Sequence, residues 1–163
     1  MVGVSEFEEL IQQVRSCTLC SLSRKRNRAV PGEGPPSADI LFVGEGPGFH
    51  EDQQGRPFVG AAGQLLEKLL NSIGLRRQEV YITNMVKCRP PNNRDPLPSE
   101  IQACRPYLDR QLDLVAPKVV VTLGRYSLAR FFPNETIGKA RGIPRKWNGL
   151  TVYPVYHPAA ALR

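Results

Sequence analysis

The sequence predicts an α/β fold in which a parallel β-sheet carries helices on both faces. Short apolar runs alternate with segments of helical periodicity along the whole chain, and no internal repeat or low-complexity linker interrupts them. The chain has 163 residues, of which 41% are hydrophobic, so it can build the core of one domain. We therefore expect a single domain over residues 1–163.

Four apolar runs are typical of strands that are buried on both faces. They lie at residues 39–45, 79–86, 118–123 and 151–156. Pro154 falls in the last run and favours an edge position or an irregularity, because proline has no N–H to donate to a neighbouring strand. Four strands separated by helices predict a central sheet of four parallel strands.

Helical spacing of apolar residues marks the segments that connect these runs. The predicted helices span residues 5–16, 61–73, about 99–115 and 125–132. Gly74 is a natural end for the second helix, and Ser99 is the expected N-cap of the third. The stretch 89–98 contains four prolines and no periodicity, which indicates a loop.

A candidate ligand site lies where the predicted strands end. In parallel α/β sheets, ligands bind beyond the carboxyl ends of the strands. Here the first strand runs into GEGPG (44–48), and the second runs into Asn84. The third ends at Gly124, and the fourth ends at His157. We expect these segments to converge on one cleft.

The glycine-rich stretch GEGPGFHEDQQGRPFVG, residues 44–60, does not match the standard phosphate-binding loops. A P-loop requires Lys followed by Ser or Thr, and a dinucleotide fingerprint requires its third glycine later than Gly48. Glu45 and Glu51 would also repel a pyrophosphate. A plain strand-to-helix turn would explain the first glycines but not the polar remainder. We therefore expect a pocket with few charges, in which backbone amides and a carboxylate position a water or a neutral ring.

Three side chains are candidates for ligand contact, each with a structural alternative. Phe58 could anchor the core or provide a stacking platform for a base. Asn84 could occupy a turn, or its amide could contact both a carbonyl and an imide N–H of a ligand. A lone histidine is more often structural, but the position of His157 between the last strand and Pro158 favours a functional role. His50, the other histidine, is expected at the surface.

The four cysteines indicate metal or cluster ligation, because disulfides are disfavoured in a cytosolic protein. Cys17 and Cys20 form C-x-x-C, and Cys88 and Cys104 add two thiolates. Four sulfurs suit either tetrahedral zinc or an iron–sulfur cluster. Zinc ribbons usually repeat the tight C-x-x-C pair, whereas 15 residues separate the second pair here, which modestly favours a cluster.

The charge is positive and uneven. The net charge is +7, and residues 10–32 and 136–163 each hold five basic residues and no acidic one. Such surfaces suit a polyanion such as nucleic acid, and solubility alone is the alternative. No run of about 18 apolar residues occurs, so we expect no membrane association. The N-terminus lacks an apolar signal core, so the expected compartment is the cytoplasm.

Several segments together resemble the family-four uracil-DNA glycosylases, iron–sulfur enzymes of base-excision repair in bacteria and archaea. The matching segments are GEGPG (44–48), ED–GRPFVG (51–60), TNMVKCRPPNNR (83–94), LG (123–124) and HPAA (157–160). They keep the family's order, and the resemblance covers roughly residues 5–163. It implies a three-layer α/β/α fold with a four-stranded parallel sheet. It also implies a monomeric prokaryotic enzyme that flips uracil out of double- or single-stranded DNA and hydrolyses its N-glycosidic bond, leaving an abasic site.

The resemblance also implies the roles of individual residues. A structural 4Fe–4S cluster would be held by Cys17, Cys20, Cys88 and Cys104. The uracil pocket would be formed by Gly44, Glu45, Gly46, Glu51, Phe58, Asn84 and His157. Phe58 would stack on the base, Asn84 would hydrogen-bond its exocyclic oxygen and ring N–H, and His157 would stabilise the uracil anion. Glu45 or Glu51 would position the water or stabilise the sugar cation, and this choice stays open.

The chain departs from the family pattern in two places. An aspartate that serves the water often occupies the position of Gly46 in the wider superfamily, so the water-activating group stays open. The family usually continues past HPAA with a polar segment and a final helix, which we expect to be absent here. Leu162 and Arg163 are then candidates for a wedge that enters the duplex.

A related branch captures uracil-DNA covalently through a histidine in a basic inserted loop. The loop 89–98 contains no histidine, so we expect turnover. The alternative function is a nucleic-acid-binding module with a structural metal and no catalysis.

Overall fold

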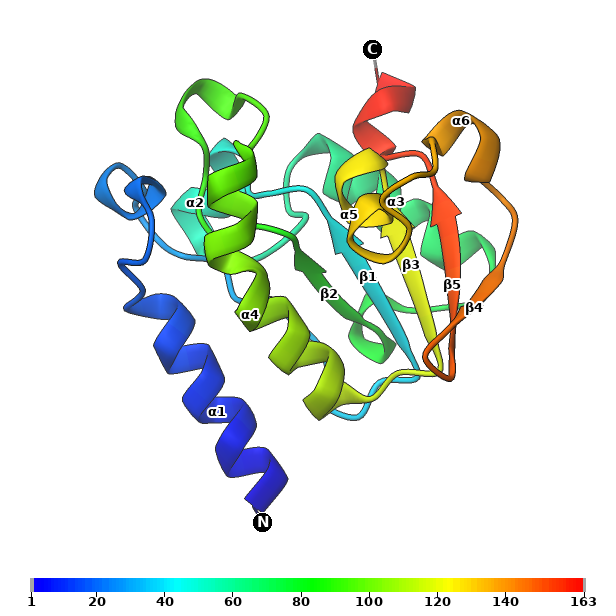
Figure 1. Ribbon diagram of the computed structural model, residues 1–163, viewed down its shortest axis with the longest axis horizontal. Helices are drawn as coiled ribbons and strands as arrows, with labels where there is room; N and C mark the ends of the chain where they lie inside the picture. Colours follow the sequence, from blue (N-terminus) through cyan, green and yellow to red (C-terminus); the bar gives the residue numbers. More distant parts are fainter. Residues whose placement is uncertain (1, 163) are drawn as a thin grey trace.

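The fold is a three-layer α/β/α arrangement around one mixed sheet, and the computed structural model describes residues 2–162 of it (Figure 1). The strands are β1 (Ile40–Gly44), β2 (Tyr81–Asn84), β3 (Val119–Leu123), β4 (Arg145–Trp147) and β5 (Leu150–Val155). Their order is β2-β1-β3-β5-β4, with β4 antiparallel to β5 and all other pairs parallel. The predicted α/β fold is confirmed, and the four predicted strands form its parallel part.

The additional strand is β4, which the sequence analysis does not anticipate because its three residues include two basic ones and no apolar run. β4 pairs with β5 only over residues 150–152, so Pro154 has no strand beside it on that side, in agreement with the predicted edge position or irregularity. The ladder between β4 and β5 ends at Val152, so the missing N–H of Pro154 removes nothing from that ladder. The Pro154 carbonyl instead accepts the Gly142 N–H at 2.8 Å.

Helices and 3₁₀ turns connect the strands within residues 2–162. The helices are α1 (Val2–Arg15), α2 (Phe49–Gln54), α3 (Ala61–Ser72), α4 (Pro98–Val115), α5 (Arg125–Phe131) and α6 (Ile137–Ala140). The 3₁₀ turns are η1 (Ser21–Arg24), η2 (Arg77–Glu79), η3 (Pro91–Asn93) and η4 (Pro158–Leu162). The four predicted helices correspond to α1, α3, α4 and α5.

The start of α4 differs from the prediction. Pro98 is the first residue of α4 and Leu97 is its N-cap, so the predicted N-cap role of Ser99 is wrong. Proline is suited to this position because the first N–H groups of a helix have no helical partner. Glu100 completes the turn by accepting the Leu97 N–H at 2.8 Å.

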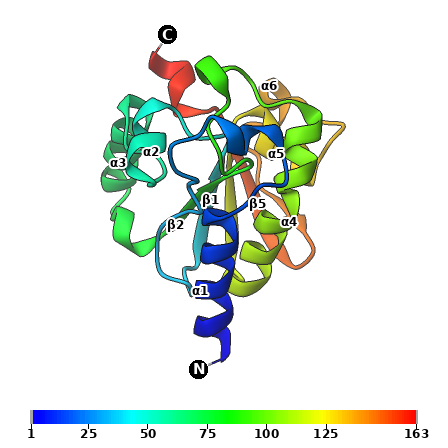
Figure 2. The ribbon, with the colours of Figure 1, turned by 90° about the vertical axis from the view of Figure 1, so that its left-hand side faces the viewer.

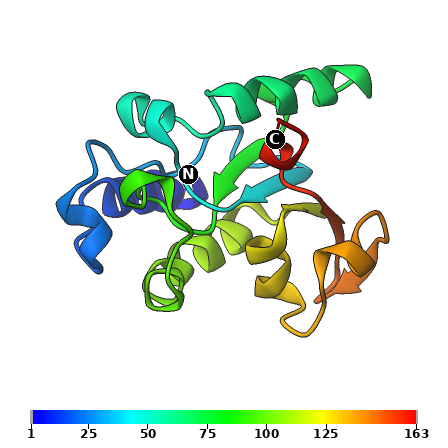
Figure 3. The same ribbon diagram turned by 90° about the horizontal axis from the view of Figure 1, so that it is seen from above.

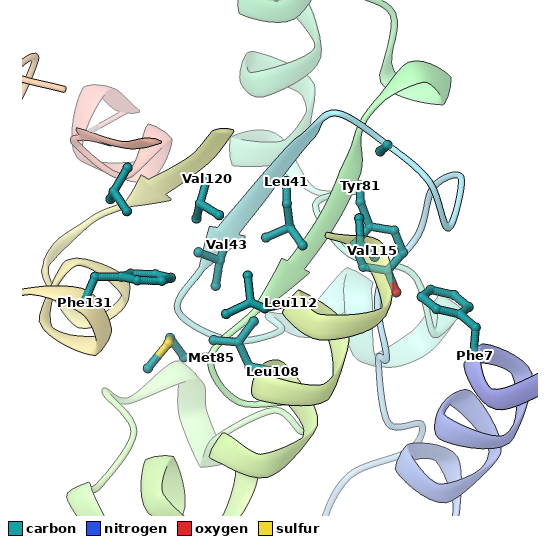
Figure 4. Packing of buried hydrophobic residues seen from close by; sticks show 12 residues of the cluster. Phe7, Leu41, Val43, Tyr81, Met85, Leu108, Leu112, Val115, Val120 and Phe131 are labelled. Atoms are coloured by element: carbon teal, nitrogen blue, oxygen red, sulfur yellow. The ribbon is translucent and has the colours of Figure 1, made fainter. Parts of the chain in front are cut away.

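Both faces of the sheet are covered, which explains why β1 is apolar throughout. Leu41 and Val43 point to one face and pack with Leu108 of α4 (Figure 4). Phe42 points to the other face and packs with Leu66 of α3. Seen from above, the sheet lies between α2 and α3 on one side and α4 and α5 on the other (Figure 3).

The segment before β1 brings the first two cysteines to the carboxyl edge of the sheet. α1 packs along α4 and begins at the end of the molecule opposite η4 (Figure 2). Phe7 of α1 contacts Tyr81 of β2 edge-on, with ring centroids 5.5 Å apart. Beyond η1 the chain returns beside β2, where the Val30 N–H donates to the Lys87 carbonyl at 2.7 Å. Within residues 2–162, no helix has both the length and the apolar character needed to cross a membrane.

Leu108→Ala is expected to lower the free energy of unfolding by about 2–5 kcal/mol, because this fully buried side chain would leave a cavity between α4 and the sheet. Leu69→Ala is the matched control, since Leu69 on α3 is half exposed and its loss should cost less than about 1 kcal/mol. Chemical denaturation followed by circular dichroism measures both values. Equal losses of unfolding free energy in the two variants would contradict the packing of Leu108 in this core.

Candidate active site

A cavity of about 330 Å³ opens where the parallel strands end. Six of the seven residues predicted for the pocket line it, namely Glu45, Gly46, Glu51, Phe58, Asn84 and His157. They come from the connection after β1, from α2, from the segment between α2 and α3, from the end of β2 and from the segment after β5. The ends of β1, β2 and β5 therefore converge on one cleft, as the sequence predicts. The end of β3 at Gly124 does not line the cavity but lies against His157.

Gly44, the seventh residue, lies beneath the cavity and allows two side chains to approach β1. A Cβ on Gly44 would lie 2.6 Å from the Phe58 ring and 2.6 Å from Asn84 Oδ1. Such distances exclude any side chain there. The neighbouring Gly63 at the start of α3 is equally constrained, because its Cβ would lie 1.9 Å from the Phe58 carbonyl oxygen. The glycines thus let Phe58 and Asn84 form a closely packed pocket floor.

The amide of Asn84 lies at the floor of the cavity and carries a buried acceptor. Asn84 is buried, and its Oδ1 has no hydrogen-bond partner among the described residues. A buried acceptor without a partner costs about 1–3 kcal/mol, so a ligand N–H at this point would be favoured. The backbone of Asn84 is held separately, because Lys87 Nζ donates to its carbonyl at 2.7 Å.

His157 stacks against Phe58 at the wall of the cavity. The two rings stack with centroids 5.6 Å apart and planes inclined at 28°. The Ala159 N–H donates to His157 Nδ1 at 3.1 Å. A neutral imidazole that accepts at Nδ1 carries its proton on Nε2, so this ring presents an N–H donor. Gly124 makes room for the residue, since a Cβ there would lie 3.2 Å from the His157 Cβ.

The carboxylate of Glu51 binds the backbone of its own loop. Oε1 accepts the Gly48 N–H at 3.0 Å, and Oε2 accepts the Val59 and Gly60 N–H groups at 2.9 and 2.7 Å. These bonds tie the start of α2 to the chain just after Phe58. The sequence analysis treats this stretch as a polar loop and misses α2. A glutamate three residues after Gly48, as in a capping box, is the signal that could have revealed it.

The three acidic side chains in the stretch 44–60 lie in different surroundings. Asp52 is buried and accepts the Asn27 N–H at 2.8 Å and Asn27 Nδ2 at 2.6 Å, which fixes the segment after η1. Glu45 lines the cavity at the end of β1. Burial is the main cause that raises the pKa of the nearby Tyr126, and the charge of Glu45 adds to it. Of these three acids, Glu45 and Glu51 line the cavity, and Asp52 does not.

The proline-rich loop 89–98 forms the rim of the cavity. Arg94 lines the cavity and pairs with Glu100 through two hydrogen bonds of 2.8 Å. The Arg94 guanidinium holds the pKa of Glu100 below its usual range, against the effect of burial. Asp95 pairs with Arg125 at 2.8 Å. These residues are not among the predicted site residues, because the sequence of a loop without periodicity does not indicate where its side chains point.

The four cysteines line one small pocket between η1, the end of β2 and α4. N–H donors point at three of the sulfurs: Leu19 N–H to Cys17 at 3.4 Å, Arg26 Nη1 to Cys88 at 3.0 Å, and Lys87 N–H to Cys104 at 3.3 Å. Burial raises the pKa of Cys104 to about 11 and also raises the pKa of Cys88. In the described part of the chain, no three His, Cys, Asp or Glu side chains are arranged to hold a single metal ion.

Lys87 lies between this cysteine pocket and the cavity. Its ammonium is buried and donates to Thr83 Oγ1, the Asn84 carbonyl and Gln111 Oε1, each at 2.7 Å. Burial lowers the pKa of Lys87 to about 8. Lys87 is not among the predicted site residues, because a sequence does not distinguish a buried lysine from an exposed one.

The remaining site predictions concern the surface. His50 is exposed, as predicted. Leu162 is exposed in η4, and Arg163 lies outside the described residues. The wedge role of these two residues stays a prediction.

Comparisons with known proteins agree on one family. The model of the uracil DNA glycosylase superfamily matches residues 31–163. The chain is 52% identical to a type-4 uracil-DNA glycosylase of Sulfurisphaera tokodaii, over 98% of this chain and 77% of the relative. Type-4 uracil-DNA glycosylases of Saccharolobus solfataricus and Thermotoga maritima are 52% and 48% identical, over 98% and 97% of this chain and 78% and 84% of the relatives. Cys17 and Cys20 precede the superfamily match but lie within the similarity to these relatives.

Glu51→Gln is expected to lower the free energy of unfolding by about 1–3 kcal/mol, because the amide nitrogen cannot accept the N–H groups that one carboxylate oxygen now accepts. Glu67→Gln provides the control, since Glu67 is exposed on α3 and its loss should have little effect. Thermal and chemical denaturation of both variants test the expectation. A Glu51→Gln variant as stable as the control would show that the hydrogen bonds of the Glu51 carboxylate contribute nothing to the free energy of unfolding.

Proposed function

We propose how this chain, which belongs to the uracil-DNA glycosylase superfamily, excises uracil from DNA: the cavity at the carboxyl edge of the sheet receives the base, and the side chains around it hydrolyse the N-glycosidic bond. The products are uracil and an abasic site. The target bond is inaccessible inside a duplex, so the deoxyuridine must leave the base stack and enter the cavity. The exposed Leu162 on η4 is proposed to fill the space that the base leaves.

The unpaired acceptor of Asn84 is the observation that carries this proposal. Uracil carries an N–H at ring position 3, and Asn84 Oδ1 would accept it, while the amide nitrogen donates to the neighbouring carbonyl. Cytosine has no hydrogen at this ring nitrogen, so Oδ1 would stay unpaired against it. Phe58 would stack on the face of the base, because its ring forms the floor next to Asn84.

His157 would stabilise the charge that develops on the leaving base. Cleavage leaves an anion on uracil and an oxocarbenium cation on the sugar. The Nε2–H of His157, fixed by the Ala159 N–H at Nδ1, would donate to the uracil carbonyl beside the breaking bond. The ring is already oriented in the free protein, so little reorganisation accompanies the reaction.

Glu45 is proposed to position the attacking water and to face the sugar cation. Gly46 cannot perform the task of the aspartate that often occupies this position in the superfamily. Both Glu45 and Glu51 line the cavity, and Glu45 directly follows β1 beside Gly46. This position supports the proposal that Glu45 serves the water. The three backbone N–H groups that Glu51 accepts support a role for Glu51 in holding the loop.

The cysteine pocket is proposed to hold a 4Fe–4S cluster through Cys17, Cys20, Cys88 and Cys104. N–H donors directed at three of the sulfurs suit thiolates better than neutral thiols, because a thiolate is the stronger acceptor. Such a cluster binds each cysteine to a different iron, so its ligands need not converge on one point as those of zinc must. When bound, the cluster would be structural and would tie the α1–η1 segment to β2 and α4.

The molecular setting is proposed as well. We propose one catalytic domain over residues 1–163 that acts as a monomer on uracil-containing DNA, single- or double-stranded, in the cytoplasm of a prokaryote. The loop 89–98 carries no histidine for covalent capture, so repeated turnover is proposed.

A duplex with one U·G pair tests the chemistry by the appearance of alkali-labile abasic sites. His157→Ala should lower kcat by roughly 10²–10³-fold, because a donor to the developing anion is lost. Asn84→Ala and Glu45→Gln should each lower kcat/KM by roughly 10-fold or more. Glu67→Gln on the exposed face of α3 is the control. If the cluster-loaded protein binds the duplex but yields no abasic product, the proposed catalysis is refuted. The alternative function, a nucleic-acid-binding module without catalysis, would then be supported.

The cofactor proposal is tested by the colour and metal content of the protein. Protein purified without oxygen should be brown, with a broad visible absorbance band and about four irons and four sulfides per chain. Cys17→Ala and Cys104→Ala should each lose this absorbance and lower the unfolding temperature. Colourless protein with one zinc per chain would refute the cluster.

A further inference from the structure

We infer that Arg77, which lies outside the cavity, is a positioning residue that holds the ring of Phe58 in place for the base; the inference rests on the proposed stacking role of Phe58. Arg77 belongs to η2 between α3 and β2. Its side chain is only 9% exposed, and it does not line the cavity. Its effect on uracil would therefore pass through Phe58.

The backbone of Phe58 needs such support. Its φ is +50°, in the left-handed region that residues other than glycine rarely adopt. This conformation crowds the Cβ against the backbone and persists only where the surroundings hold it. Gly44 lies against the Phe58 ring, and Gly63 lies against the Phe58 carbonyl. These contacts limit the position of Phe58 but do not bind its polar groups.

Arg77 binds the peptide groups on both sides of the Phe58 Cα. Its Nη1 donates to the Phe58 carbonyl at 2.5 Å, and its Nη2 donates to the Pro57 carbonyl. The Pro57 carbonyl belongs to the peptide plane whose orientation sets φ of Phe58, and the Phe58 carbonyl belongs to the plane whose orientation sets ψ. One planar guanidinium can hold both carbonyls at once, which the single ammonium of lysine does less well. Arg77 therefore determines where the Phe58 ring points.

Glu33 fixes Arg77 to the sheet. Arg77 Nε donates to Glu33 Oε2 at 3.0 Å, and Arg56 Nε donates to Glu33 Oε1 at 2.6 Å. The backbone of Glu33 pairs with Ile82 on the outer edge of β2, through hydrogen bonds of 2.9 and 2.8 Å. Arg56 and Arg77 together hold the pKa of Glu33 below its usual range, against the effect of burial. The chain of contacts thus runs from β2 through Glu33 and Arg77 to Phe58.

A double-mutant cycle separates positioning from general support of the fold. The variants are Arg77→Met, Phe58→Leu and the two combined, assayed by single-turnover excision from a U·G duplex at a temperature where circular dichroism shows all of them folded. Arg77→Met should lower kcat/KM by roughly 100-fold, mostly through KM, because a displaced ring weakens binding of the base in ground and transition states alike. In the Phe58→Leu background the same change should cost less than about threefold.

Two further variants sharpen the result. Arg56→Met is the matched control, because it removes the other partner of Glu33 without touching Phe58, and it should change kcat/KM by less than about threefold. Arg77→Lys keeps a charge beside Glu33 and should retain part of the activity; it replaces Arg77→Met in the cycle if the methionine variant does not fold. The inference would be overturned if the double variant lost kcat/KM by the product of the two single losses. It would also be overturned if Arg77→Met left kcat/KM unchanged. Absence of excision by the wild-type protein would instead refute the proposed function itself.

Discussion

The close approach of Phe58 to the carboxyl end of β1 is the constraint on which the rest of the site depends. It requires glycine at Gly44 and at Gly63, and it places the ring against Asn84. The backbone around Phe58 is then held on one side by Arg77 and on the other by Glu51, which accepts the two N–H groups that follow. A loop rich in glycine and charge thus becomes rigid because its charged groups bind backbone.

The cysteine pocket and the cavity are joined by a short segment at the end of β2. Asn84, Lys87 and Cys88 lie within five residues of one another, and the ammonium of Lys87 holds the carbonyl of Asn84. The N–H of Lys87 points at Cys104. Ordering of the cysteine pocket would therefore also order the amide that is proposed to read the base, although none of the four cysteines lines the cavity.

The sequence predicts the sheet and the pocket residues well because their signals are local. Apolar runs mark the four parallel strands, and the rule that ligands bind at carboxyl strand ends brings Glu45, Asn84 and His157 together. The strand β4 is missed because it has three residues and no apolar run, although Asn148-Gly149 between β4 and β5 is a typical hairpin turn. The helix α2 is missed although Glu51 follows Gly48 at the spacing of a capping box. The binding partners of Glu51 and Arg77 cannot be read from the sequence, because they are backbone atoms, which every residue has.

The unpaired oxygen of Asn84 has a consequence for genome integrity. Cytosine outnumbers uracil in DNA by a very large factor, so even a rare error would create more lesions than the enzyme removes. A pocket that merely lacked an attractive contact to cytosine would discriminate weakly, whereas one that leaves a buried polar atom unpaired with the wrong base can discriminate by roughly 10⁴–10⁵-fold. In the proposed role of Asn84, one unsatisfied acceptor in the resting protein would thus be a source of fidelity.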